Sequence, residues 1–148
     1  MEIEDEIKGR FRNEYHKVVI NLIYTSNFIN HRFEHFLKRH GLTSQQYNIL
    51  RVLRGFRSEP RSIDFLRERM LDKSSDMSRI IERLYLKKLV ERKENKTDRR
   101  KKDIKIGQKG LDLLNQMHDC EKKTDALLSN LSQDEAVQLN RLLDKIRD

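Results

Sequence analysis

A long run without glycine or proline, residues 12–39, is the feature that most constrains how this chain can fold. Apolar side chains recur along it every three or four residues, which is the spacing of one face of an α-helix. These side chains are Phe11, Tyr15, Val18, Leu22, Ile29, Phe33 and Phe36, and Val19, Ile23 and Leu37 widen the stripe. At 1.5 Å per residue the helix would be roughly 40 Å long, which is longer than a domain of this size needs for its own core. We therefore expect part of the stripe to face another chain.

Glycine and proline are scarce throughout, since the 148 residues contain only five and one of them. This scarcity argues against a turn-dense sandwich or barrel and favours helices. Apolar residues make up 36% and charged residues 38%, so a monomer would have a thin core, and burial against a partner is favoured. The length suits one compact domain or two small interdependent parts. The fold class that we expect is mainly α, with a minor α+β part.

Signals for shorter helices surround the long one. Ile3 and Ile7 predict a short leading helix, and Gly41 is expected to end the long helix. The expected N-caps of the next three helices are Thr43 or Ser44, then Ser62, then Ser74 or Ser75.

After residue 88 the pattern changes from helical to alternating. Residues 89–93 and 102–106 are predicted as two short strands, and polar residues 95–99 join them in a loop that is long enough to project. A second long helix is predicted from the apolar stripe between Leu111 and Leu128. A capping box that runs from Ser132 to Glu135 predicts where the last helix begins.

The positive charge of the chain is concentrated in its middle. Residues 66–109 hold 16 lysines and arginines against eight acidic residues, whereas the rest of the chain holds 16 of each. The net charge of +8 therefore belongs entirely to this segment, and residues 92–102 are its densest part. The positive electrostatic field of such a segment attracts polyanions, of which nucleic acid is the commonest. The alternative interpretation is a charged surface that contacts only solvent.

The helices expected after Ser62 and after Ser74 are spaced as a helix-turn-helix, and the hairpin that follows is placed as a wing. In the second helix Met77, Ile80, Ile81 and Leu84 would point inward. The candidate DNA-binding residues on its outer face and at its N-terminus are Ser74, Ser75, Asp76, Ser78, Arg79 and Arg83. Serine hydroxyls can bond to bases or phosphates, arginine can bond bidentately to guanine or phosphate, and a helix N-terminus favours phosphate.

The predicted wing carries a second set of candidates. They are Lys96, Arg99, Arg100, Lys101 and Lys102. Arginines on such a loop can reach a minor groove, whose negative potential attracts them. Asp98 is interpreted as an anchor that pairs with an arginine within the chain and stiffens the tip; an accidental surface acid is the alternative.

At these residues the chain resembles the MarR-type winged-helix regulators. The segments that carry the resemblance are Leu66-Arg67-Glu68-Arg69-Met70, residues 73–84, Lys88-Leu89-Val90-Glu91-Arg92, Asp98-Arg99-Arg100 and Gly107-Gln108-Lys109-Gly110. The resemblance implies a homodimer held by its terminal helices and bound to a palindromic operator, with the recognition helix in the major groove and Arg100 in the minor groove. It also implies a repressor that a small ligand or an oxidant releases. The expected division is 1–40 and 110–148 for dimerisation and 41–109 for DNA binding.

The sequence departs from this family at three points. Leu71 and Lys88 stand where glycine is frequent, so a left-handed backbone is expected at Lys88. Relatives that sense peroxide have a reactive cysteine near the start of the first long helix, and this chain has none there. Its single cysteine, Cys120, lies on a later apolar stripe and is interpreted as a core or interface residue in a reducing compartment.

Other sites are weighed on weaker signals. Aromatic residues could line an effector pocket for a small aromatic or phenolic molecule, although core packing is the alternative. These residues are Tyr24, Phe28, Phe36, Tyr47 and Phe56. His31 and His35 share a helix face but lack an obvious third ligand, so no metal and no cofactor is expected. No catalytic motif is present, so an enzyme is not expected.

The sequence therefore predicts a dimeric, sequence-specific regulator that binds double-stranded DNA. Two alternatives stay open: a basic protein that binds nucleic acid without sequence preference, and a helical adaptor whose hairpin docks an acidic partner. No membrane-spanning segment is predicted, and the acidic N-terminus is unlike a signal peptide. We expect a soluble cytoplasmic protein associated with the nucleoid.

Overall fold

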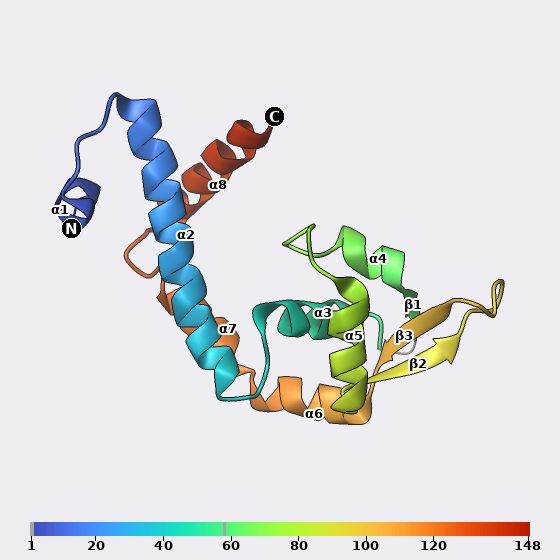
Figure 1. The fold of residues 1–148 in the computed structure, drawn as a ribbon. Helices are drawn as coiled ribbons and strands as arrows, with labels where there is room; N and C mark the ends of the chain where they lie inside the picture. The colour runs from blue at the N-terminus through green and yellow to red at the C-terminus, as the bar shows by residue number, and fades with distance from the viewer. Residues whose placement is uncertain (1, 58) are drawn as a thin grey trace. The chain divides into compact units, whose positions relative to one another are not determined.

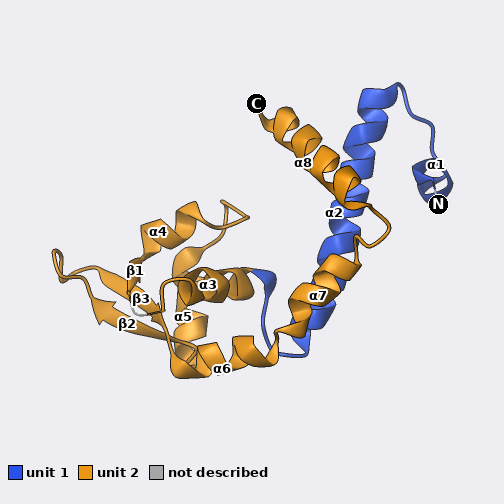
Figure 2. Ribbon diagram, turned by 180° about the vertical axis from the view of Figure 1, so that it is seen from behind, with its two compact units in different colours: residues 1–44 blue, residues 45–148 orange. Residues whose placement is uncertain are grey.

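The computed structural model describes residues 2–57 and 59–148. It forms two compact units, residues 1–44 and 45–148 (Figure 2). Among the described residues there are eight helices and three short strands, so the expected mainly α fold with a minor sheet is confirmed (Figure 1).

The first unit consists of a short helix and a long one. Helix α1 spans Ile3–Ile7 and α2 spans Glu14–Lys38, as the sequence predicts. The α2 N-cap is Asn13, whose side chain accepts a hydrogen bond of 2.9 Å from the backbone of His16. Gly41 has a φ of +68°, which is the left-handed conformation expected of the residue that ends such a helix.

Apolar side chains remain exposed along α2. Tyr15 is 84% exposed, Ile23 55% and Val19 52%, although a helix normally turns its apolar stripe toward a core. Within residues 1–44 the buried apolar side chains are Ile3, Leu37 and Leu42. Four of the ten predicted stripe residues are therefore exposed, five are half-buried, and one, Leu37, is fully buried.

Three helices contribute many of the buried side chains in the core of the second unit. Helix α3 spans Ser44–Arg54, α4 spans Ile63–Glu68 and α5 spans Met77–Leu86. The predicted inward residues of α5 are all buried; these are Met77, Ile80, Ile81 and Leu84. Ser62 caps α4 as expected, since its hydroxyl accepts a hydrogen bond of 3.1 Å from the Phe65 backbone.

The N-cap expected for α5 is wrong. Neither Ser74 nor Ser75 caps the helix; Asp76 does, and its carboxylate accepts a hydrogen bond of 3.2 Å from the Arg79 backbone. Aspartate is as strong an N-cap as serine, and hydrogen bonds to Asp72 hold the two serines in the preceding turn. The helix therefore begins later than the sequence predicts.

The wing is part of a three-stranded antiparallel sheet. Its strands are β1 (Arg61–Ser62), β2 (Val90–Glu94) and β3 (Lys102–Ile106), in the order β1-β3-β2. Val90 is paired with Ile106 at one end of the hairpin and Glu94 with Lys102 at the other. The hairpin was expected, but β1 was not, because two residues are too few to show an alternating pattern.

Two backbone positions fix how the hairpin leaves α5. Lys88 has a φ of 61°, which confirms the left-handed conformation expected there. Gly110 lies so close to the chain that a Cβ at this position would be 2.3 Å from the carbonyl oxygen of Leu89. Glycine is therefore required at residue 110 for α6 to lie against the start of the hairpin.

The C-terminal third contains three helices, α6 (Gln108–Gln116), α7 (Asp119–Ala126) and α8 (Gln133–Arg147). The single long helix expected between Leu111 and Leu128 is wrong, because the chain tightens at Met117 and His118 into bonds of the i to i−3 type, such as Cys120 N–H to Met117 C=O at 2.8 Å. The capping box at Ser132 and Glu135 is confirmed. None of the described α8 side chains is buried.

No helix within the described residues is both long enough and apolar enough to cross a membrane.

Candidate nucleic-acid interface

Helix α5 separates a buried face from a charged one. Ser78, Arg79, Glu82 and Arg83 are all exposed, whereas Met77, Ile80, Ile81 and Leu84 are buried in the core. Arg79 and Arg83 have no ion-pair partner within residues 2–57 and 59–148. Their guanidinium groups are therefore free to bond to an external anion.

The turn before α5 holds Ser74 and Ser75. The Asp72 carboxylate accepts hydrogen bonds from the Ser74 backbone at 2.9 Å and from the Ser74 hydroxyl at 2.6 Å. The Ser75 hydroxyl donates to the Asp72 carbonyl at 2.8 Å and accepts from the Gln45 side chain at 3.1 Å. Both hydroxyl protons thus serve the turn, and a ligand could use only the remaining lone pairs on these oxygens.

The same bonds act on the charge of Asp72. Hydrogen bonds from the side chain and backbone of Ser74 favour the ionised carboxylate and lower the pKa of Asp72 below its ordinary value. The turn is therefore built on a charged carboxylate at neutral pH.

An ion pair that the sequence did not predict connects α5 to the wing. Arg92 on β2 pairs with Glu82 on α5, and its guanidinium lies 4.2 Å from the centre of the Tyr85 ring. This contact neutralises the acidic side chain on the outer face of α5. The pair is separated by ten residues and joins two elements, so no local spacing rule could indicate it.

The wing presents exposed cations. All five predicted wing residues are exposed, and they lie in the loop or at the first position of β3: Lys96, Arg99, Arg100, Lys101 and Lys102. Lys102 lies 3.5 Å from Glu94, and the other four have no ion-pair partner among the described residues. Figure 1 shows the hairpin extending beyond the helices of its unit.

Asn95 organises the tip of the wing. Its side-chain oxygen accepts hydrogen bonds from the Thr97 backbone, the Thr97 hydroxyl and the Asp98 backbone at 3.0, 2.7 and 2.9 Å. Its amide nitrogen donates to both oxygens of Asp103 at 3.1 Å. A polar loop that would otherwise be flexible is thereby held in one conformation. Sequence reasoning missed Asn95, although asparagine at the start of a turn is a known signal.

Asp98 bonds within the same loop. Its carboxylate accepts a hydrogen bond of 3.0 Å from the backbone N–H of Arg100, and the bond that the structure describes is to the backbone and not to a guanidinium group. This bond positions the backbone of Arg100 and leaves the Arg100 side chain exposed.

The residues predicted to line an effector pocket are divided between the two units. Tyr24, Phe28 and Phe36 lie on α2, whereas Tyr47 lies on α3 and Phe56 follows α3. Their joint pocket stays a prediction. Burial raises the pKa of the Tyr47 hydroxyl, so this side chain is a neutral phenol at physiological pH.

The remaining candidates are the histidines and the cysteine. His31 and His35 are both exposed on α2, and no group of three metal-ligating side chains was found in the described part of the chain. Cys120 is buried, and burial raises the pKa of its thiol. A protonated, buried thiol is a poor nucleophile.

The chain is similar to known transcription regulators. The sequence model of the MarR family matches residues 40–101. The HTH-type transcriptional regulator MhqR of Bacillus subtilis is 27% identical over 130 residues, which cover 87% of each chain.

Two solved structures show the same fold. A cysteine-to-serine mutant of MarR from Escherichia coli, in complex with operator DNA, has a TM-score of 0.76 at 22% identity and covers 93% of this chain and 99% of its own. The organohalide-sensing regulator RdhR, bound to 2,4-dichlorophenol, has a TM-score of 0.80 at 19% identity, with coverages of 94% and 85%.

Proposed function

Because the chain belongs to the MarR family of DNA-binding winged helix-turn-helix transcriptional regulators, we propose that it represses transcription by binding a palindromic operator as a homodimer. We further propose that a small-molecule effector releases it from the operator. As a regulator and not an enzyme, it would act at the nucleoid in the cytoplasm.

The observation that carries this proposal is a set of free cations on two adjoining elements. Arg79 and Arg83 on α5, and Arg99 and Arg100 on the wing, are exposed and have no ion-pair partner among the described residues. A surface built only to be solvated would tend to pair such charges with nearby acids. Free guanidinium groups on a helix and on a projecting hairpin suit a phosphate backbone and base edges.

We assign the two elements to different grooves. Helix α5 would lie in the major groove, which is wide enough for a helix, with Ser78, Arg79 and Arg83 facing the bases or phosphates. The wing would place Arg100 in the adjacent minor groove, while Lys96 and Lys101 contact phosphates. Ser74, Ser75 and Asp76 would position the start of α5 next to the backbone.

The dimer is supported by uncovered apolar surface on the terminal helices. Val18, Val19, Ile23 and Phe28 are exposed on α2. On α8 the exposed apolar side chains are Val137, Leu139, Leu142 and Ile146. Burying these side chains against a second copy would add to the thin apolar core of the monomer. A twofold dimer would read two half-sites about 34–36 Å apart.

The effector is proposed to be a small aromatic or phenolic molecule. The solved structure of RdhR with 2,4-dichlorophenol gives an example of such a ligand in a protein of this fold. In this chain the aromatic side chains predicted for the pocket are Tyr24, Phe28, Phe36, Tyr47 and Phe56.

The experiment that tests the proposed function is selection of bound sequences from a random duplex library, repeated at several salt concentrations. We expect a palindromic consensus whose enrichment persists as the salt rises. Binding that falls steeply with salt and selects no sequence would mean a non-specific nucleic-acid protein. Failure to bind any duplex at low salt would contradict DNA binding and favour a protein partner for the basic hairpin.

A further inference from the structure

Arg92 lies in a row of the sheet whose central residue belongs to the core. It is directly opposite Ile104 on β3, and Ile104 is in turn directly opposite Arg61 on β1. Residues that are directly opposite in an antiparallel sheet share a face, so these three side chains leave the sheet on the same side. Ile104 is fully buried and the two arginines are half-buried. An arginine therefore borders the apolar core at each edge of the sheet.

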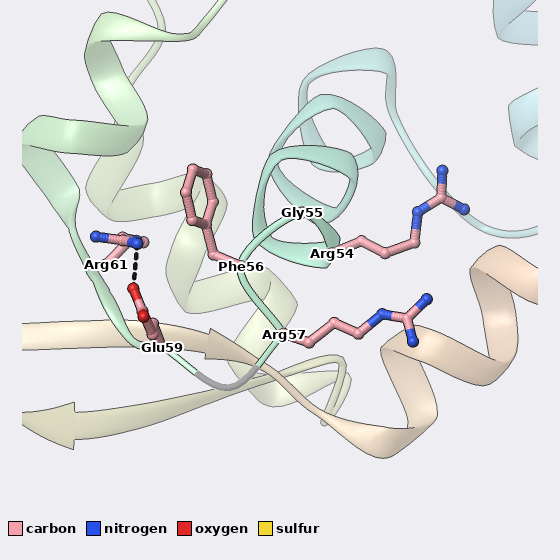
Figure 3. A pocket seen from close by; sticks show the side chains of 6 residues that line it. All are labelled: Arg54, Gly55, Phe56, Arg57, Glu59 and Arg61. Carbon is pink, nitrogen blue, oxygen red and sulfur yellow. Dashed lines mark hydrogen bonds and ion pairs between the residues drawn. The ribbon is translucent and has the colours of Figure 1, made fainter.

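The two arginines contact different parts of the chain. Arg61 pairs with Glu59 and lies 4.2 Å from the centre of the Phe56 ring (Figure 3). It also lies 5.0 Å from the centre of the Phe65 ring, so its contacts connect β1 with the end of α3 and with α4. Arg92 has the same two kinds of contact, an ion pair and an aromatic ring, but both of its partners lie on α5.

The partners of Arg92 hold its guanidinium group from two directions. Glu82 and Tyr85 are three residues apart on α5, so they are neighbours on the helix surface. Glu82 forms the ion pair, and the centre of the Tyr85 ring is 4.2 Å from the guanidinium carbon. A planar guanidinium group that is both paired and stacked has a fixed position and a fixed orientation. This contact joins the middle of α5 to the middle of β2, the strand that lies against the helix (Figure 1).

We propose that Arg92 is a positioning residue that determines specificity: by holding α5 and the wing at one angle, it sets the spacing between the major-groove and minor-groove contacts within one half-site. The inference rests on the proposed function and deepens it. With a rigid connection, docking of α5 also places Arg100 at its base step, and this preorganisation adds to the affinity for one particular spacing. Without the connection each element still binds DNA, but neither places the other.

Glu82 gives the proposal a sign that charge alone would not give. A carboxylate on a DNA-facing helix repels phosphates, so its neutralisation would strengthen binding to every duplex if only charge mattered. In the proposal Glu82→Gln releases Arg92 and thereby weakens binding to the operator. The affinity for a scrambled duplex, which needs no fixed spacing, should stay equal or rise.

Fluorescence anisotropy with a selected operator and with a scrambled duplex of equal length tests this sign. The proteins are the full chain, Glu82→Gln, Arg92→Gln and the double variant. We expect each single variant to lose roughly three- to tenfold in the ratio of operator affinity to scrambled affinity, and the double variant to lose no more, because the two residues act as one unit. An unchanged ratio in Glu82→Gln, or losses that multiply in the double variant, would overturn the proposal.

The same strand offers a matched control. Glu91 and Lys93 flank Arg92 on the opposite face of β2, where the lysine nitrogen lies 3.3 Å from the carboxylate and both side chains are exposed. Glu91→Gln and Lys93→Gln remove the same two charges without touching α5. They should change both affinities by equal factors and leave the ratio unchanged. A ratio that falls as far in these controls as in Arg92→Gln would mean that charge, and not position, is responsible.

Exchange of the two charges distinguishes positioning from a general loss of structure. Glu82→Arg combined with Arg92→Glu restores the ion pair, so it should recover part of the ratio that Arg92→Glu alone loses. Circular dichroism should show the same helix content in both proteins. No recovery by the exchanged pair in a folded protein would contradict the role of the ion pair.

Residual dipolar couplings of the free chain separate this inference from the proposed function, because they measure the orientation of the wing relative to α5 without DNA. We expect one orientation in the wild-type chain and in Lys93→Gln, and averaged couplings in Arg92→Gln. Unaltered couplings in Arg92→Gln would overturn the inference even if an operator is selected. If the wing loosens as expected but the wild-type chain selects no operator, the proposed function fails and the structural role of Arg92 stands.

Discussion

Asp72 shapes the turn before α5, because its carboxylate accepts hydrogen bonds from both the backbone amide and the hydroxyl of Ser74. The sequence pointed to Ser74 as a helix cap and a DNA contact. Which partner a short polar side chain takes depends on the backbone around it, so serine, aspartate and asparagine are the residues whose roles local patterns predict least well. Arg92 shows the same limit for charges, since its partner Glu82 lies on another element.

The hydrogen bonds of Asp72 predict a titration that one substitution should move. In the folded chain the pKa of Asp72 is lowered chiefly by the Ser74 hydroxyl, so this turn is stabilised above the ordinary pKa of aspartate. The stabilisation is lost as the pH falls through the lowered pKa. Ser74→Ala should move the pKa of Asp72 upward, as measured by NMR of its carboxyl carbon. Ser78→Ala, which alters an exposed hydroxyl on α5, should leave it in place.

Arg100 is predicted to make a specific contact in the minor groove. Arg100→Ala should weaken operator binding by about 1–3 kcal/mol, the range expected for a base-reading arginine. A gel-shift titration measures the change. Arg147→Ala removes the same charge from a side chain that is paired with Asp144 near the C-terminus, and it serves as the control. Equal affinities for the two variants would remove Arg100 from the site.

Among the elements, periodicity predicted the long helix α2 and the hairpin well, because in each of them the pattern of apolar residues is repeated several times. It failed where an element is short or interrupted. Strand β1 has two residues and exists only because β3 pairs with it. The break between α6 and α7 lies within an unbroken apolar stripe, and only the hydrogen bonds at Met117 and His118 reveal it.

Lys88, which follows α5 in a left-handed conformation, is predicted to destabilise the folded chain. A left-handed backbone costs a residue with a Cβ roughly 1–2 kcal/mol, while glycine at such a site costs about 0.5–1 kcal/mol in entropy. Lys88→Gly should therefore raise the free energy of unfolding by up to about 1 kcal/mol, as measured by urea denaturation. Lys88→Ala keeps the Cβ and should give no comparable gain; equal gains would mean that the backbone is not strained.

The wing is predicted to depend on Asn95 for its conformation. Asn95→Ala removes the hydrogen bonds to Thr97, Asp98 and Asp103, so the loop that carries Arg100 should become mobile. We expect operator affinity to fall several-fold while the circular dichroism of the helices is unchanged. Lys96→Ala, which removes one exposed cation from the same loop, should mainly reduce the salt dependence of binding. A rigid wing in Asn95→Ala, as seen by NMR relaxation, would contradict this role.

At the scale of the whole molecule, the distribution of apolar surface favours a dimer. The chain was expected to have a thin core, and the exposed residues of α2 and α8 agree with that expectation. The charge has an equally simple distribution, with its entire excess between residues 66 and 109. The proposed dimer would double this basic surface and would make its binding to DNA steeply dependent on salt.

Ile23→Glu should disrupt this dimer. Ile23 is 55% exposed on α2, so a charge there would cost the folded unit little but would be buried without a partner in a dimer interface. Sedimentation analysis should show a shift toward the monomer and, with it, a large loss of operator affinity. Ile23→Leu keeps an apolar side chain and should remain dimeric. A monomeric wild-type chain would refute the prediction outright.

The sequence by itself determined the helical class, the position of the hairpin, the inner face of α5 and the basic segment. Periodicity, glycine placement and charge count are local or additive properties, so they can be seen without a fold. Only the tertiary structure decided that Asp76 caps α5, that Asn95 holds the wing tip and that Arg92 pairs with Glu82. It also brought Arg51 and Arg54 to Glu121, 67 residues beyond Arg54. The ion pairs of Arg92 and of Arg51 and Arg54 follow from which segments the packed core brings side by side, and no spacing along the chain encodes that. The bonds of Asp76 and Asn95 are local, but the sequence alone does not say which of several neighbouring polar side chains forms them.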